Sequence, residues 1–170
     1  QAAVESYLKA LEITQDYDNN LKCGLNNSIG STYISMGEYE KAFSPLKKGK
    51  DACNLLNRKI RIAEWNRIVG NYFENRPGAI KEADYDSATF HYEKAIDLFE
   101  DLGTSLGLVD ALRSASEVYR KRGDMKKAET FLKKAYSIVI DIQNKSGEIN
   151  VLFSLADFYR QKGDYRKADE

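Results

Sequence analysis

Four versions of one short phrase decide the fold of this chain: Gly-Glu-Tyr-Glu-Lys-Ala at residues 37–42, Ala-Asp-Tyr-Asp-Ser-Ala at 83–88, Gly-Asp-Met-Lys-Lys-Ala at 123–128 and Gly-Asp-Tyr-Arg-Lys-Ala at 163–168. The closing alanines stand at positions 42, 88, 128 and 168, so they are separated by 46, 40 and 40 residues. A regular period of this length is typical of solenoids, in which each unit buries its apolar face only against its neighbours. The sequence therefore predicts a repeat array.

A helical pattern precedes each phrase. Large and small residues recur at positions i, i+3, i+4 and i+7, which share one face of an α-helix. The four sets are Asn26, Ile29, Gly30 and Tyr33; Trp65, Ile68, Val69 and Tyr72; Leu112, Ala115, Ser116 and Tyr119; and Leu152, Leu155, Ala156 and Tyr159. Three of these helices are followed by a glycine (Gly37, Gly123 or Gly163), which can end a helix in the left-handed conformation. Each unit is thus predicted to be two helices joined by a short turn.

The period also divides the chain. We predict one array over residues 1–170, with a partial repeat at 1–20, repeats at about 21–58, 59–103 and 104–145, and a truncated repeat at 146–170. The fold class that follows is all-α, a right-handed superhelix (α-solenoid) of antiparallel helix–turn–helix units. Because both ends fall inside second helices, we expect further repeats or an output domain in a longer parent chain. The extra residues at 76–82 are interpreted as a surface loop, with a binding rim as the alternative.

Composition narrows the choice of partners. The chain holds 26 Lys and Arg against 26 Asp and Glu, so its formal net charge is zero. This balance removes the usual electrostatic reason to propose binding to nucleic acid or to a membrane surface. No apolar run approaches the ~18 residues that a bilayer crossing needs, so we expect no membrane insertion. We place the protein in the cytoplasm, with the periplasm as the alternative if it belongs to a membrane-bound sensor.

Two cysteines leave a choice open. Cys23 lies 14 residues before Gly37 and Cys53 lies 16 residues after it, so antiparallel helices would bring the two to a similar height. We favour two reduced and buried thiols, because free cysteine packs as a small hydrophobe. The alternative is a disulfide, which would require an oxidising compartment.

The order of these residues resembles the tetratricopeptide repeat over essentially the whole chain. The resemblance rests on large–x–x–large–small–x–x–Tyr, then Gly–Asp–Tyr–x–x–Ala, in four recurrences. Members of that family usually repeat every ~34 residues, whereas the spacing here is close to 40, so the chain resembles a long-period type. The resemblance implies that the first helices line a concave groove, which receives a protein or peptide ligand.

Groove positions carry over by motif. They are Asn27, Ser31, Asn66, Arg67, Phe73, Arg113, Glu117, Arg120, Phe153, Asp157 and Arg160. An acidic or amphipathic peptide would suit this wall, because Arg binds carboxylates and Phe supplies an anchor. The alternative is that the charged residues pair with one another on a solvated face. Ser31 and Glu117 stand where a carboxylate clamp for chaperone tails would favour Asn, so that mode of binding is disfavoured.

Catalysis finds little support in the sequence. No phosphate loop, nucleophile elbow or metal-ligand cluster occurs, and we expect no catalytic residue, no metal site and no cofactor. The single histidine, His91, is predicted to lie outside the core in solvent. The leading hypothesis is a non-enzymatic interaction scaffold that binds its partner in the concave groove. The alternative is a sensory region of a bacterial signalling protein, a histidine kinase or transcription regulator, whose output domain lies outside this chain.

Overall fold

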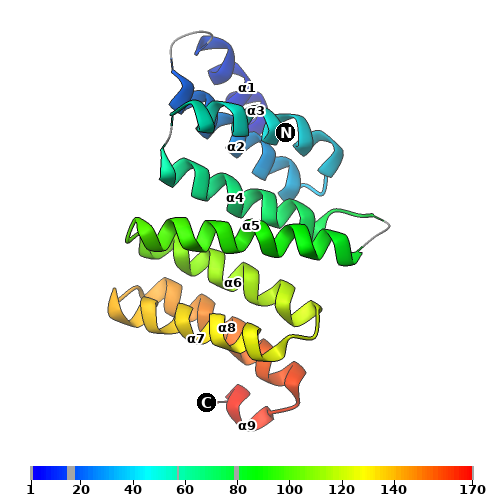
Figure 1. Ribbon diagram of the computed structural model, residues 1–170, viewed down its shortest axis with the longest axis vertical. Coiled ribbons are helices and arrows are strands. Elements are labelled where there is room, and N and C mark those ends of the chain that lie inside the picture. The colour runs from blue at the N-terminus through cyan, green and yellow to red at the C-terminus, as the bar shows by residue number, and fades with distance from the viewer. Residues whose placement is uncertain (1, 15–17, 57, 79–80, 170) are drawn as a thin grey trace. The chain divides into compact units, whose positions relative to one another are not determined.

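The computed structural model describes residues 2–14, 18–56, 58–78 and 81–169, and all regular structure in these ranges is helical (Figure 1). The chain divides into two compact units: unit 1 is Gln1–Leu98 and unit 2 is Phe99–Glu170. The helices are α1 (Ala2–Ile13), α2 (Asn19–Ser35), α3 (Tyr39–Leu56), α4 (Lys59–Asn75), α5 (Lys81–Asp101), α6 (Ser105–Lys121), α7 (Met125–Asp141), α8 (Lys145–Lys162) and α9 (Tyr165–Asp169).

Sequential antiparallel pairs confirm the predicted all-α repeat fold. The first and second helices of the repeats are α2 with α3, α4 with α5, α6 with α7, and α8 with α9. Within the described residues, none of the helices combines the length and the apolar character that a bilayer crossing requires.

The turns between paired helices repeat one geometry. Gly37, Gly123 and Gly163 have φ values of 73°, 82° and 79°, which confirms the predicted left-handed helix ends. In each turn the residue after the glycine donates its backbone N–H, at 2.9 Å, to the carbonyl oxygen of the tyrosine that ends the helical pattern; these tyrosines are Tyr33, Tyr119 and Tyr159. This bond satisfies a carbonyl that the end of a helix leaves without a partner.

Small residues set the distance between paired helices. The phrase-closing residues Ala42, Ala88 and Ala128 are 0% exposed. A Cβ atom added to Gly30 would lie 2.6 Å from a methyl carbon of Leu46, and one added to Gly70 would lie 2.6 Å from the ring of Tyr92. Since carbon atoms pack at about 3.5–4 Å, any larger residue at these two positions would collide with the facing side chain, and glycine lets the paired helices pack closely.

Each unit has its own apolar core. In unit 1, Ile34, Ala42, Leu46, Ile68, Val69 and Tyr72 form one cluster. In unit 2 the corresponding cluster is Tyr119, Ala128, Leu132, Phe158 and Tyr159. Glu129 of α7 adds a polar link to α8, since it accepts hydrogen bonds from Tyr159 and Lys162. Hydrogen bonds from Lys133 and Lys162 lower the pKa of Glu129 to about 2.

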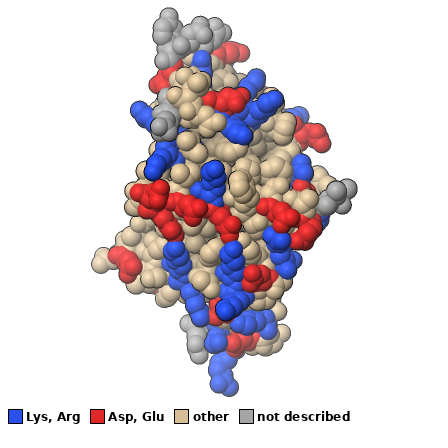
Figure 2. Space-filling model, in the orientation of Figure 1, with Lys and Arg blue, Asp and Glu red and all other residues tan. Residues whose placement is uncertain are grey.

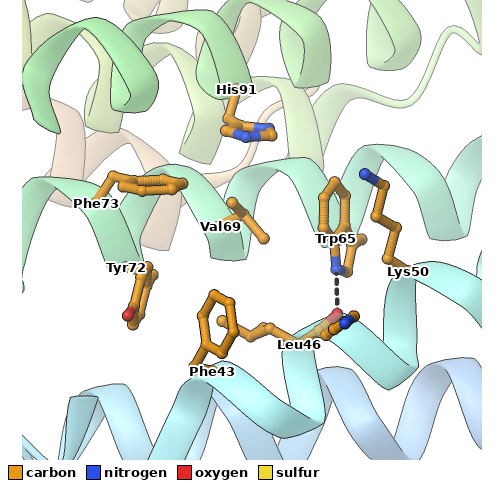
Figure 3. Close-up of a pocket in the computed structure, with 9 residues that line it drawn as sticks. Phe43, Leu46, Lys50, Trp65, Val69, Tyr72, Phe73 and His91 are labelled. Atoms are coloured by element: carbon orange, nitrogen blue, oxygen red, sulfur yellow. Dashed lines mark hydrogen bonds between the residues drawn. The ribbon is translucent and has the colours of Figure 1, made fainter. Parts of the chain in front are cut away.

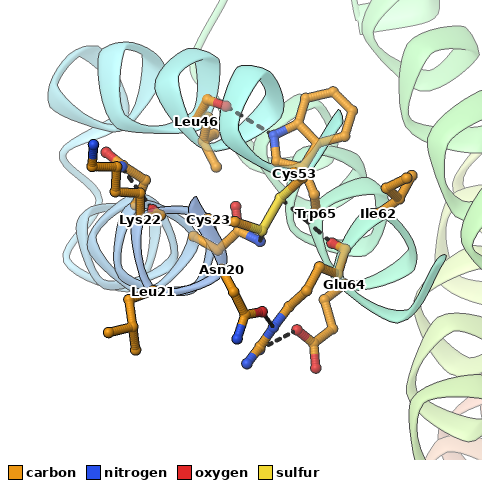
Figure 4. The surroundings of a disulfide bond; sticks show 12 residues. Asn20, Leu21, Lys22, Cys23, Leu46, Cys53, Ile62, Glu64 and Trp65 are labelled. Atoms are coloured by element: carbon orange, nitrogen blue, oxygen red, sulfur yellow. Dashed lines mark hydrogen bonds and ion pairs between the residues drawn. A yellow bond between two sulfur atoms is a disulfide. The ribbon is translucent and has the colours of Figure 1, made fainter. Parts of the chain in front are cut away.

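A disulfide corrects the prediction of two reduced thiols. Cys23 of α2 and Cys53 of α3 are bonded across the pair, with their Cα atoms 5.0 Å apart (Figure 4). Both residues are buried, and Ala52, Ile62 and Trp65 pack around them. The spacing predicted their neighbourhood correctly. The preference for free thiols was wrong because the packing brings the two cysteines within bonding geometry and not merely to a similar height.

The interruption at 76–82 begins with an anchored residue. Arg76 donates from Nε to Asp84 Oδ1 at 3.0 Å, and its guanidinium lies 5.0 Å from the centre of the Phe73 ring. Asp84 is buried, so this ion pair fixes the start of α5 to the end of α4. Residues 79 and 80 lie outside the described residues, and the role of the interruption in binding stays a prediction.

Two substitutions test the core of unit 2. Tyr119→Ala should lower the free energy of unfolding by about 3 kcal/mol or more, as expected for truncation of a buried aromatic residue. Ala128→Leu should lower it by about 1–3 kcal/mol, because the site has no room for the added atoms. Chemical denaturation followed by circular dichroism measures both. Ala83→Leu, at an exposed alanine of α5, is the matched control and should change little. Unchanged stability in the first two variants would show that the repeat register is wrong.

Reduction of the disulfide tests its contribution. The bridge closes a loop with a sequence separation of 30 residues, for which the chain-entropy model gives on the order of 3–4 kcal/mol. A reductant should therefore lower the melting temperature of the wild type. The Cys23→Ser/Cys53→Ser variant should melt at the lower temperature with or without reductant. A wild-type melting curve that does not respond to complete reduction, verified by intact mass, would contradict this contribution.

Candidate functional site

A pocket in unit 1 lies between α3, α4 and α5. It encloses about 230 Å³, and Figure 3 shows its side chains converging from the three helices. Its lining residues are Phe43, Leu46, Lys47, Lys50, Trp65, Val69, Tyr72, Phe73 and His91. All but the two lysines and His91 are apolar or aromatic. An apolar pocket with a few polar groups at its edge is the usual form of a binding site.

Helical spacing explains how the sequence builds this pocket. Phe43, Leu46, Lys47 and Lys50 follow one another at i, i+3, i+4 and i+7, so they occupy one stripe of α3. Along α4 the lining residues fall at i, i+4, i+7 and i+8, starting from Trp65. The indole N–H of Trp65 donates to the carbonyl oxygen of Leu46 at 2.8 Å, which fixes the ring between α3 and α4.

His91 forms the wall contributed by α5, which corrects the prediction that it lies in solvent. Its ring stacks on Phe73 with 5.8 Å between centroids and 5° between planes, and it meets Trp65 edge-on at 5.5 Å. Its Nδ1 lies 2.9 Å from Oδ1 of Asn66. Burial, together with the charges of Lys50 and Lys94, lowers the pKa of His91 from 6.5 to about 4. The imidazole is therefore neutral near pH 7 and belongs to the apolar wall.

Two lysines of α3, Lys47 and Lys50, border the pocket. Within the described part of the chain, neither Lys47 nor Lys50 forms a salt bridge, whereas Lys41 on the same helix pairs with Glu38. The Lys50 ammonium instead lies 5.5 Å from the centre of the Trp65 ring. Figure 2 shows basic side chains over α3 and a row of acidic side chains over α5. Positive charge therefore accompanies the apolar surface on the α3 side.

The predicted groove residues of unit 1 do not form one exposed wall. Asn27 and Asn66 are 4% and 3% exposed. The Nδ2 atom of Asn27 lies 4.0 and 3.9 Å from the two disulfide sulfurs, and Asn66 faces His91. Phe73 lines the pocket. Ser31 and Arg67 are half-buried. The family motif predicts a groove position for both asparagines, whereas their side chains are buried.

The predicted groove residues of unit 2 lie on a surface of α6 and α8. Arg113 donates from Nε to Ser154 Oγ at 3.1 Å, which joins the two first helices. Arg120 binds both Gln161 of α8 and Glu117 of its own helix. Arg160 pairs with Asp157 at 2.5 Å. Phe153, by contrast, is 73% exposed. Pairing among the charges is the arrangement that the alternative interpretation of these residues predicted.

Sequence reasoning did not identify the pocket. Trp65, Val69 and Tyr72 were recognised as core positions, and Lys47 and Lys50 were not assigned a role. One sequence signal could have indicated the pocket: large apolar and basic residues share one stripe of α3. These residues are Phe43, Leu46, Lys47 and Lys50. Its meaning depended on α4 and α5, whose positions are set by packing.

Comparison with known proteins gives the family of part of the chain. Residues 79–141 match the model of the tetratricopeptide repeat. This segment is thus similar to tetratricopeptide repeats. It includes α5, α6 and α7, and repeats of this family are generally protein–protein interaction units without catalytic activity. No curated protein matched the sequence.

Solved structures extend the fold to nearly the whole chain. BtubC (BKLC) from P. vanneervenii has a TM-score of 0.78 at 16% identity over 96% of this chain, which spans 66% of the length of that relative. The nearly identical TPR-like repeats of a Podosopora anserina protein described as a kinesin light chain match with a TM-score of 0.70 at 14% identity, over 99% of this chain and 82% of theirs. A point variant of those repeats gives a TM-score of 0.72 at 14% identity, over 99% and 81%. At these identities the likeness shows a tetratricopeptide-like fold.

From the surroundings of His91 we predict the midpoint of its titration. Since it is the single histidine, its ring proton signals are unambiguous in a nuclear magnetic resonance titration. The midpoint should lie at about 4 rather than 6.5. Because the unfolded chain then binds the proton more readily than the folded chain, stability should fall as the pH drops from 6.5 to about 4. A midpoint near 6.5 would contradict the half-buried, neutral imidazole.

Proposed function

We propose that this chain is a non-enzymatic interaction scaffold that holds a peptide or partner protein along its first helices. The tetratricopeptide repeats at 79–141 support an interaction role. In unit 2, α6 and α8 are joined side by side by the Arg113–Ser154 hydrogen bond. The surface made by Arg113, Arg120, Phe153 and Arg160 is named here the first-helix surface.

The exposed ring of Phe153 is the observation that carries this proposal. Its side chain is 73% exposed, which leaves a large apolar group uncovered on the helix that also carries Arg160. Phe153 is next in sequence to Ser154, the partner of Arg113. Aromatic residues and arginines are the side chains that most often dominate binding energy at protein interfaces. An acidic or amphipathic peptide fits this combination, because its carboxylates can replace Asp157 and Glu117 as partners of the guanidinium groups.

Ion pairs that already exist within the first-helix surface limit the affinity that a partner can gain from its charges. Arg160 and Asp157 already form an ion pair, so a partner gains only the difference between its own contacts and the existing ones. Exposed pairs of this kind contribute about 0–1 kcal/mol each. The apolar contact with Phe153 is therefore expected to supply most of the affinity, while the arginines select acidic partners over basic ones. The alternative role in a bacterial sensor concerns sequence outside residues 1–170 and stays a prediction.

Selection from a displayed library of random peptides tests the proposal and does not require the natural partner. Peptides selected on the folded chain should be enriched in acidic and large apolar residues. In calorimetric titrations, Arg113→Glu/Arg120→Glu/Arg160→Glu should weaken their binding at least about tenfold, since three lost pairs at roughly 0.5 kcal/mol each reach the 1.4 kcal/mol of one decade. Phe153→Ala should weaken it at least as much, because the apolar contact is expected to supply most of the affinity.

The control changes the same charge elsewhere. Lys9→Glu/Lys48→Glu/Lys126→Glu alters three exposed lysines and should leave the affinity within about twofold, because remote surface charges are screened by salt. Equal losses in both triple variants would show that only net charge matters. Selected peptides that bind the Phe153→Ala and arginine variants at full affinity would overturn the assignment of the first-helix surface.

A further inference from the structure

The pocket of unit 1 shares no residue with the first-helix surface. Its walls come from the second helices α3 and α5 together with the α4 side chains that face them. Within the described residues, the lining set contains five aromatic or imidazole rings and no carboxylate. Phe43 is 58% exposed at its edge, and its ring lies 6.4 Å from that of Tyr72. A large apolar surface is thus open to a partner at a place that the three helices themselves do not fill.

Charge decides what kind of partner the pocket suits. Lys47 and Lys50 lie one turn apart on α3 and border the apolar walls. Neither has a carboxylate partner among the described residues, and Lys94 adds its field from α5, as the lowered pKa of His91 shows. A positive edge on the α3 side of a neutral, apolar interior complements a ligand that carries acidic residues next to one apolar side chain.

We propose that this pocket is a second docking site, which binds an acidic peptide segment through one large apolar side chain. A side chain of the size of Phe enters between Phe43, Val69 and Phe73, and the flanking carboxylates meet Lys47 and Lys50. The neutral His91 closes the far wall without placing a charge against the apolar group. This site does not depend on the first-helix surface, so either can fail while the other stands.

Trp65 provides a built-in reporter for the test. It is the single tryptophan of the chain, it lines the pocket, and its indole is fixed by the bond to Leu46. The probes are three blocked pentapeptides without tryptophan: Asp-Glu-Phe-Asp-Glu, the same peptide with Ala in place of Phe, and Lys-Lys-Phe-Lys-Lys. The first should change the Trp65 emission saturably. The other two should bind at least about tenfold more weakly, since each loses either the apolar anchor or the charge complementarity.

Two matched pairs of variants locate the binding. Lys47→Glu should weaken the first peptide about fivefold or more, whereas Lys48→Glu, an equal charge change outside the lining set, should stay within about twofold. Phe43→Ala should weaken it about tenfold, whereas Leu106→Ala, at an exposed leucine of α6 outside the lining set, should stay within about twofold. Circular dichroism melting of each variant confirms that it is folded.

Several outcomes would overturn the proposal. They are the absence of a saturable emission change up to millimolar peptide, equal effects of Lys47→Glu and Lys48→Glu, and full affinity in Phe43→Ala. Loss of binding in Phe153→Ala with retention in Phe43→Ala would place the peptide on the first-helix surface and leave that proposal standing. Binding that follows Phe43 and Lys47, with no effect of the arginine triple variant, supports the pocket alone.

Discussion

The close approach of the two helices in each pair is the constraint on which the rest of this structure depends. At Ala42, Ala88 and Ala128 the side chain is completely buried, and at Gly30 and Gly70 even a Cβ atom would meet a neighbouring side chain. Large residues must then lie on either side of these contacts, where they form the separate clusters of the two units. A backbone this close also brings Cys23 and Cys53 within bonding distance, so the disulfide is a consequence of the same packing.

One position of the repeat, three residues after the phrase-closing alanine, carries a different side chain in each unit. Three residues after Ala128, Phe131 packs against the core of unit 2 and meets Tyr119 edge-on at 5.6 Å. Three residues after Ala88 the chain has His91, which stacks on Phe73, and partial burial together with two nearby lysines lowers the pKa of its imidazole. His91 lines the pocket between α3, α4 and α5. The same repeat position thus carries a residue packed on the core in unit 2 and a pocket-lining imidazole in unit 1.

Much of the repeat architecture could be predicted, because its causes are local. The spacing of alanines located the helix pairs, and the glycines at 37, 123 and 163 took the left-handed conformation that their place after a helix indicated. The candidate site was harder to predict. The family motif predicts groove positions for Asn27 and Asn66, but both are buried, since the disulfide lies against Asn27 and His91 lies against Asn66 in this chain.

The sequence by itself determined the all-α class, the pairing of helices and the conformation of the turns, since periodicity, small residues and glycine act within one unit of the chain. Only the tertiary structure decided that the two thiols are joined, that His91 forms part of an apolar wall, and that Arg113 of α6 bonds Ser154 of α8. These properties depend on contacts between residues from 18 to 41 positions apart, and each contact crosses from one helix to another. Their distances and partners follow from how side chains fill the space between helices, which no single segment specifies.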